Sequence, residues 1–175
     1  MPATAISRRQ LLRGDVTGRE AAIRPPWSIP EPRFSEVCDC SGRCVSACPE
    51  GILALGRGRL PFVDFGHGEC TFCGECLRAC PTGALTSDGP GAAPWRIEAR
   101  ISDACLARSG VVCRTCADQC DEDAIRFLPR LRSAAIPVID DETCSGCGAC
   151  YAPCPVGAVS LRERASRSTR KESPA

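Results

Sequence analysis

One run of four cysteines constrains this chain more than any other feature: Cys144-Ser145-Gly146-Cys147-Gly148-Ala149-Cys150-Tyr151-Ala152-Pro153-Cys154-Pro155. Its C-x2-C-x2-C-x3-C-P spacing is that of bacterial iron–sulfur proteins, in which cysteine thiolates bind the iron of 4Fe-4S clusters. The short loops curl the backbone so that three sulfurs point into one pocket, and small intervening residues leave amide N–H groups free for hydrogen bonds to cluster sulfur. The run therefore predicts a cluster-binding loop and not a catalytic nucleophile.

Altered copies of this run make up the rest of the sixteen cysteines. The second group keeps the standard spacing. In the first group Ser41 stands where the second cysteine is expected, so either Cys40 reaches the iron through a rearranged loop or the site is weaker and labile. The third group has a longer first loop, C-x7-C, and Asp121 in place of proline. The predicted cluster ligands are Cys38, Cys40, Cys44, Cys48, Cys70, Cys73, Cys76, Cys80, Cys105, Cys113, Cys116, Cys120, Cys144, Cys147, Cys150 and Cys154.

Zinc and disulfides are the other common uses of so many cysteines. Structural zinc sites usually combine two well-separated C-x2-C pairs, whereas here three or four cysteines fall within about eleven residues. A proline also follows three of the four groups. The sequence therefore favours iron–sulfur clusters, up to four of the 4Fe-4S type.

In two-cluster proteins the cysteine before the proline ligates the cluster of the other motif. This rule predicts that the four groups exchange their last cysteines in pairs. The expected sets are Cys38, Cys40, Cys44 with Cys80; Cys70, Cys73, Cys76 with Cys48; Cys105, Cys113, Cys116 with Cys154; and Cys144, Cys147, Cys150 with Cys120.

The apolar content is low for a chain of this length. Ile, Leu, Val and Phe together make up 34 of 175 residues, a level at which burial alone hardly offsets the conformational entropy of folding. We therefore expect metal ligation to supply much of the folding free energy, and the metal-free chain to be largely unfolded.

Several partner classes are not expected from this composition. No apolar run approaches the roughly 20 residues of a membrane span, and no signal peptide is recognised, so the sequence predicts a soluble, intracellular protein. The formal charge is +1, and four clusters on sixteen thiolates would add about −2 each. Nucleic acid is therefore not an expected partner.

Residues 1–34 contain no cysteine and several prolines, and they are predicted to form a flexible N-terminal arm. Arg8 and Arg9 resemble the twin-arginine export consensus, but the residues that follow are too polar for the apolar region of a signal. The arm is either a disordered basic tail or a docking segment with Arg8, Arg9 and Trp27 as partner-binding residues. Trp27 is alternatively a cap on the first cluster domain.

Short strands are expected between the cysteine groups. Apolar residues in 52–55 and 60–65 flank a Gly-Arg-Gly turn and predict a hairpin. The alternating pattern of 95–101 predicts a half-buried strand. Further strands are expected at 124–127, 135–139 and 157–161, with a turn at 128–133 and a linker at 86–94.

The chain has the organisation of a tandem duplication. Cys48 and Cys70 are separated by 21 residues, and Cys120 and Cys144 by 23. We predict an α+β fold of two ferredoxin-like domains, 35–89 and 95–162, each with two clusters, short hairpins and short helices, and a disordered tail at 163–175. His67 is expected to be a solvated loop residue, and the acidic run Asp118 to Asp123 to lie beside the third site.

The chain resembles the NapF-type ferredoxin-like family, accessory iron–sulfur proteins of the periplasmic nitrate reductase system. The resemblance extends from about residue 6 to residue 161. The residues that carry it are Ser7-Arg8-Arg9, Ile23-Arg24-Pro25-Pro26-Trp27, Asp103 to Ala107 with the long loop to Cys113-Arg114-Thr115-Cys116, and Cys144 to Cys150.

This resemblance implies a role that is not enzymatic. It implies a cytoplasmic accessory in the maturation of the catalytic subunit NapA before export, with the NapA precursor as partner. The alternative is a plain ferredoxin that passes electrons to or from membrane redox subunits or a soluble reductase.

Overall fold

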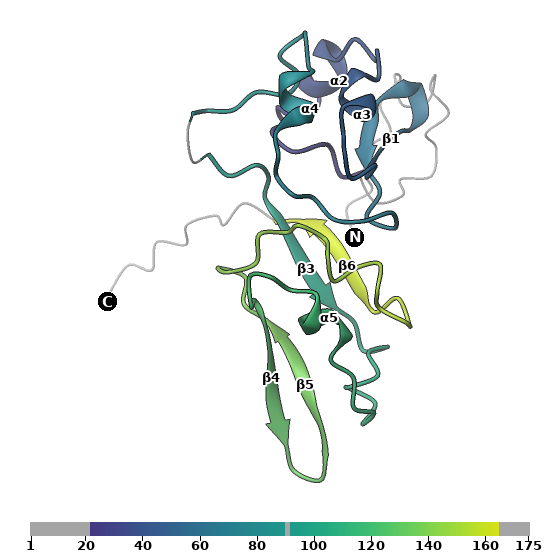
Figure 1. Ribbon diagram of the computed structural model, residues 1–175, viewed down its shortest axis with the longest axis vertical. Coiled ribbons are helices and arrows are strands. Elements are labelled where there is room, and N and C mark those ends of the chain that lie inside the picture. The colour runs from purple at the N-terminus through teal and green to yellow at the C-terminus, as the bar shows by residue number, and fades with distance from the viewer. Residues whose placement is uncertain (1–21, 90–91, 165–175) are drawn as a thin grey trace, which may run out of the picture.

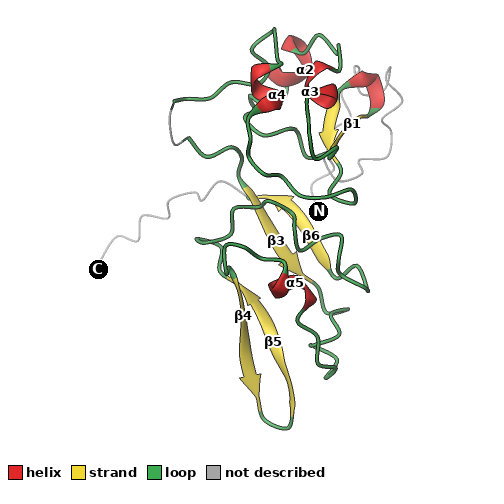
Figure 2. Cartoon of the chain, in the orientation of Figure 1, coloured by secondary structure: helices red, strands yellow, loops and turns green. Residues whose placement is uncertain are grey.

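The computed structural model describes residues 22–89 and 92–164 (Figure 1). Its helices are single turns and loops make up most of the chain (Figure 2). Arg8, Arg9 and most of the predicted tail lie outside the described residues. The elements in chain order are α2 (Arg33–Val37), α3 (Arg43–Ser46), β1 (Leu53–Leu55), the 3-10 helix η1 (Arg57–Arg59), β2 (Pro61–Val63), α4 (Glu75–Arg78), β3 (Ile97–Ile101), α5 (Thr115–Asp118), β4 (Ile125–Arg130), β5 (Ser133–Ile139) and β6 (Val159–Glu163).

These elements form two stacked halves, as Figure 1 shows. The first half contains α2, α3, α4 and the β1–β2 hairpin; the second contains α5 and two further antiparallel pairs, β3–β6 and β4–β5. No helix in the two described segments has the length and apolarity needed to cross a bilayer.

The predicted hairpin of the first half is confirmed. Leu53 pairs with Val63 and Leu55 with Pro61, while the Gly56 N–H donates to the Leu60 carbonyl oxygen at 2.9 Å. Gly58 adopts a φ of 65° inside the turn, a conformation that glycine reaches without steric cost.

In the second half, the first and last predicted strands pair with each other. Ile97 lies opposite Glu163 and Ile101 opposite Val159, so that β3 and β6 form one sheet across the whole half. The other hairpin is longer than predicted, because β4 continues to Arg130 and β5 begins at Ser133. A register shift between Leu128 and Arg130 accommodates Pro129, which has no N–H to donate to the ladder.

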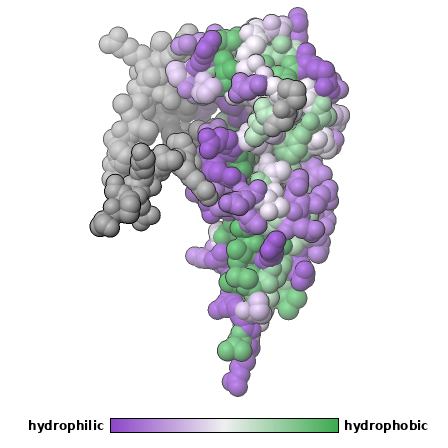
Figure 3. All heavy atoms as spheres, turned by 90° about the vertical axis from the view of Figure 1, so that its left-hand side faces the viewer, coloured by the Kyte–Doolittle hydropathy of each residue, from purple (hydrophilic) through white to green (hydrophobic). Residues whose placement is uncertain are grey.

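This β4–β5 hairpin projects from the body of the molecule (Figure 1). Figure 3 shows it as a narrow extension, with hydrophobic residues on the surface above its tip. Leu128, Leu131 and Val138 are large apolar side chains exposed on it, and Leu131 is 98% exposed.

The prediction of a flexible arm over residues 1–34 is wrong for residues 22–34, the part that the structure describes. Phe34 is fully buried in the core, and Pro25 and Pro26 are among the most buried side chains. The Val63 N–H donates to the Ile23 carbonyl oxygen at 2.9 Å. The prolines keep this segment extended, as expected, but they pack against the first half instead of leaving it in solvent.

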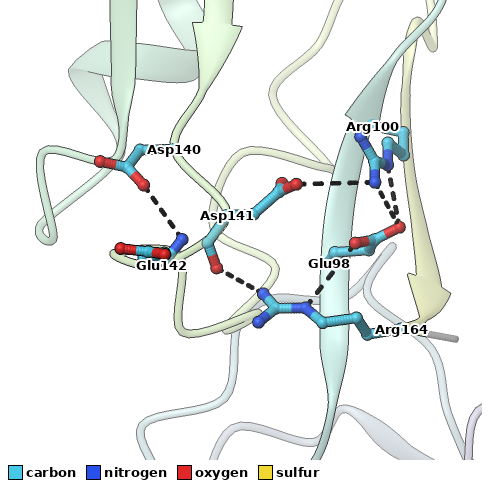
Figure 4. Close-up of polar contacts among 6 residues, drawn as sticks. All are labelled: Glu98, Arg100, Asp140, Asp141, Glu142 and Arg164. Atoms are coloured by element: carbon cyan, nitrogen blue, oxygen red, sulfur yellow. Dashed lines mark hydrogen bonds and ion pairs between the residues drawn. The ribbon is translucent and has the colours of Figure 1, made fainter. Parts of the chain in front are cut away.

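A network of charged side chains links β3 and β6 to the loop after β5 (Figure 4). Arg100 lies 2.7 Å from Glu98 and 3.6 Å from Asp141. Arg164 Nη2 donates to the Asp141 carbonyl oxygen at 2.5 Å, and its Nε lies 3.7 Å from Glu98. Glu98 therefore interacts with two arginines, one in β3 and one directly after β6.

Candidate cluster-binding sites

The cysteines line four pockets, numbered here by the motif that contributes most of them. Each pocket is open to solvent on one side. Their cysteines are Cys38, Cys44 and Cys80 in pocket I; Cys48, Cys70, Cys73 and Cys76 in pocket II; Cys105, Cys113, Cys116 and Cys154 in pocket III; and Cys120, Cys144, Cys147 and Cys150 in pocket IV.

Each pocket thus takes its last cysteine from the neighbouring motif. The structure brings together the cysteine sets that the two-cluster rule predicts, with one exception. Cys40 lines none of these four pockets, whereas Ser41 and Asp39 line pocket I.

Glycines and single helical turns shape the motif loops. Gly42 and Gly74 have φ values of 77° and 75°, and α3 and α4 begin at the next residue. Each of these turns carries the third cysteine of its motif, Cys44 or Cys76, into the interior, where both are buried. A side chain at either glycine would be strained, because the left-handed conformation places Cβ too close to the backbone.

Strands supply the apolar walls of the pockets in the second half. In β3, Ala99 lines pocket IV and Ile101 lines pocket III. Their cross-strand partners in β6, Leu161 and Val159, line the same two pockets. Residues two apart in a strand share one face, so a single face of the β3–β6 sheet borders both pockets.

The chemistry of these cysteines fits a cationic group with soft-ligand preference. Burial raises the pKa of Cys76 and of Cys150 to about 12, and neighbouring thiols add to the effect. Burial likewise raises the pKa of Cys70 to about 11. Four thiolates gathered in such a pocket require positive charge to offset their desolvation and repulsion, which iron bound to sulfur provides.

A single metal ion fits this arrangement less well than a cluster. In residues 22–89 and 92–164, no three His, Cys, Asp or Glu side chains are placed to hold one ion. The cysteines instead line a shared pocket from several sides, as the ligands of a multi-iron cluster do.

Backbone N–H groups point at the cysteines exchanged between motifs. The Leu85 N–H donates to Cys80 Sγ at 3.4 Å, and the Ala158 N–H to Cys154 Sγ at 3.2 Å. Burial alone would raise the pKa of Cys80, but the hydrogen bonds from Leu85 and Thr82 hold it below its usual value. Donors of this kind stabilise thiolate charge and tune the potential of a bound cluster.

Pockets II and IV meet at the junction between the halves. The Cys70 N–H donates to the Cys147 carbonyl oxygen at 2.8 Å. Trp95 Nε1 donates to the Ser145 carbonyl oxygen at 3.2 Å. The Trp95 ring packs edge to face against Phe65 and Phe72, with ring centroids 5.8 and 5.7 Å apart. The four pockets therefore follow one another in the order I, II, IV, III. The sequence did not predict this junction. Phe72, the aromatic residue between Cys70 and Cys73, was the signal available for it.

Other predicted residues lie as follows. Trp27 is half-buried and lines pocket II, so it caps a site of the half to which it belongs. His67 is an exposed loop residue, as predicted, 3.3 Å from Asp64. The acidic run was expected beside the third site, but Glu122 lines pocket IV, because Cys120 before it belongs to pocket IV.

Comparison with known proteins gives a consistent result. A family model described as a 4Fe-4S dicluster domain matches residues 37–84 and again residues 111–158. The ferredoxin-type protein NapF of Escherichia coli strain K12 is 41% identical over 153 residues, which cover 87% of this chain and 92% of the relative.

Relatives of lower identity also match over most of the chain. NapF of Haemophilus influenzae is 36% identical over 173 residues, covering 93% of this chain and 97% of the relative. The methylamine utilization ferredoxin-type protein MauM of Paracoccus denitrificans is 35% identical over 157 residues, covering 81% and 70%. The two dicluster matches include every pocket-lining cysteine except Cys105.

Proposed function

Because the chain belongs to the NapF family of ferredoxin-type iron–sulfur proteins, we propose that it is a cytoplasmic redox accessory in the maturation of NapA, the catalytic subunit of periplasmic nitrate reductase. It acts on the NapA precursor before export. The observation that carries the proposal is the similarity to NapF over 92% of that relative's length, together with four cysteine-lined pockets in series.

The cysteines of pockets II, III and IV are proposed as the ligands of one 4Fe-4S cluster each, and those of pocket I as ligands of a fourth. When bound, such clusters store and transfer single electrons. The chain's own part is to hold the thiolates, to exclude water with apolar walls such as Ile52 and Leu161, and to donate N–H groups to Cys80 and Cys154.

The series arrangement supports a redox role. Pockets I and III are the first and last of this series. Pockets II and IV adjoin through the hydrogen bond from the Cys70 N–H to the Cys147 carbonyl oxygen.

A plain electron carrier is the second candidate. The similarity to MauM favours it, since the name of that protein ties it to methylamine utilization and not to nitrate. Membrane redox subunits or a soluble reductase would then be the partners.

A strain lacking the gene separates the two functions. The maturation role predicts a normal amount of NapA polypeptide with low nitrate reductase activity, which artificial electron donors do not restore. Full activity with artificial donors would contradict it and support the carrier. An anaerobic pull-down with the chain as bait adds a direct reading, in which recovery of the NapA precursor is expected.

A further inference from the structure

Pocket I differs from the other three in its ligand set, and the backbone shows how. In the second and fourth motifs, the residue just before the second cysteine has a left-handed φ: 53° at Phe72 and 75° at Gly146. In the first motif the residue with that conformation is Cys40, with φ 57°. Cys40 therefore occupies an intervening position of the loop.

Ser41 consequently stands at the ligand position. The next residue is a left-handed glycine in all three motifs: Gly42, Gly74 and Gly148. The loop thus has the standard conformation of a C-x2-C motif, with serine in place of the second cysteine. The irregular spacing is a substitution and not a rearrangement of the loop.

The side chains agree with this register. Pocket I is lined by Cys38, Cys44 and Cys80 and by Ser41 and Asp39. Fifteen of the sixteen cysteines line one of the four pockets, and all sixteen fall in the described part of the chain. The exception is Cys40, whose Sγ lies 3.7 Å from the Cys38 carbonyl oxygen.

Two oxygen-bearing side chains, Ser41 and Asp39, line pocket I, which has only three cysteines. Ser41 donates to Asp39 Oδ1 through its backbone N–H at 3.1 Å and through its hydroxyl at 2.8 Å. Asp39 thereby orients Ser41 beside the pocket. Oxygen is a harder ligand than thiolate and holds cluster iron less firmly.

We propose that pocket I is a three-thiolate site whose fourth corner is an oxygen position, and that Cys40 is a free thiol in the loaded protein. The oxygen comes from the Ser41 hydroxyl or from water held beside Ser41 and Asp39. The inference rests on the proposed ligand sets. One iron of the cluster in pocket I is consequently more exchangeable than the iron in pockets II, III and IV.

Alkylation of the loaded protein tests the free thiol. The anaerobically purified holoprotein is treated with N-ethylmaleimide and its peptides are analysed by mass spectrometry. We expect one adduct per chain, on Cys40, and none in the matched Cys40→Ala variant. Protection of Cys40 equal to that of Cys73 would overturn the inference. Adducts spread over pockets II to IV would instead show that the clusters are absent and that the proposed function fails.

Mild oxidation tests the oxygen corner. Ferricyanide takes one electron from the cluster, one iron leaves as Fe²⁺, and a three-iron cluster with its own electron paramagnetic resonance signal remains. We expect this signal in the wild type and in Cys40→Ala, and its loss in Ser41→Cys, which supplies a fourth thiolate. Loss of the signal in Cys40→Ala, or its persistence in Ser41→Cys, would contradict the three-thiolate site.

Two further variants complete the design. Cys38→Ala, which removes a pocket-lining thiol, should lose about four iron atoms per chain, whereas Cys40→Ala should keep the wild-type content. A loss of iron in Cys40→Ala equal to that in Cys38→Ala would overturn the proposal. Ser41→Ala identifies the oxygen: Mössbauer parameters of the unique iron change if the hydroxyl is the ligand and stay the same if water is.

Discussion

Gly148 lies at the contact between the two halves of the molecule. It follows Cys147 in the loop of pocket IV, with a φ of 91°, and it packs against the ring of Phe65. A Cβ at this position would lie 2.1 Å from Phe65 Cδ1. Since Phe65 is buried in the core of the first half, neither the loop nor the ring has room to retreat.

Gly148→Ala should therefore destabilise the protein by about 2–5 kcal/mol. Left-handed strain contributes roughly 1–2 kcal/mol and overpacking against Phe65 about 1–3 kcal/mol. The midpoint of thermal unfolding, followed by circular dichroism of the loaded protein, measures the change. Gly157→Ala is the matched control, because Gly157 has a φ of 59° but nothing within 4 Å of its Cβ position. Equal losses in the two variants would remove the steric part of this explanation.

At this scale the sequence predicts which cysteines gather but not which atoms touch. Motif spacing and the exchange rule are enough to place Cys48 with the second motif and Cys154 with the third. They leave Cys40 and Ser41 open, because spacing carries no information on φ. The contact of Phe65 with Gly148 depends on how the two halves pack, and no local pattern encodes it.

The β3–β6 pair is the element that closes the second half. Glu98 of β3, whose side chain is 14% exposed, faces Arg100 at 2.7 Å and Arg164 at 3.7 Å. Arg100 also lies 3.6 Å from Asp141, which follows β5 (Figure 4). The network therefore connects both sheets of this half.

Removing the shared carboxylate should weaken that connection. Glu98→Gln is expected to destabilise the protein by about 1 kcal/mol, the upper end for exposed ion pairs, since two arginines lose one partner. The midpoint of thermal unfolding again measures it. Glu163→Gln makes the same change of charge at an exposed position of β6 and should have little effect. If both variants behave alike, net charge and not the network is responsible.

Strand existence followed from local pattern, whereas strand pairing did not. The alternation of residues 95–101 was sufficient to predict β3, yet its partner β6 lies beyond two cysteine motifs. The turn of the β4–β5 hairpin is shorter than the predicted 128–133, because β4 continues to Arg130 and β5 begins at Ser133. A bulge at Pro129 lets the ladder continue, and such irregularities depend on the opposite strand.

For the whole molecule, the cysteines are part of the core. Each of the three clusters of buried apolar residues contains at least one cysteine: Cys44 and Cys76 in the first, Cys150 in the second and Cys105 in the third. The buried residues of the described segments include no polar or charged ones. The apolar core is thus built around the proposed ligands.

Removal of iron should accordingly unfold most of the protein. Treatment with a chelator and an oxidant, followed by desalting under reducing conditions, is expected to abolish most of the far-ultraviolet circular dichroism of the short strands and helices. Anaerobic reconstitution with iron and sulfide should restore it. A spectrum unchanged after complete loss of iron would show that apolar packing alone sustains the fold.

The tandem organisation could be predicted from the repeated spacing, but the first boundary could not. Pro25 and Pro26 suggested an extended arm, and the chain there is extended. Its burial depends on how Ile23 and Trp27 pack against the core of the first half, which the local sequence does not reveal.

The exchange of cysteines between motifs also sets an order for biosynthesis. With the ligand sets proposed here, pocket II has all its cysteines once Cys76 has left the ribosome, and pocket I waits for Cys80. Pocket IV waits for Cys150 and pocket III, whose first cysteine is Cys105, for Cys154. No pocket can therefore be completed before the second motif of its half has been synthesised.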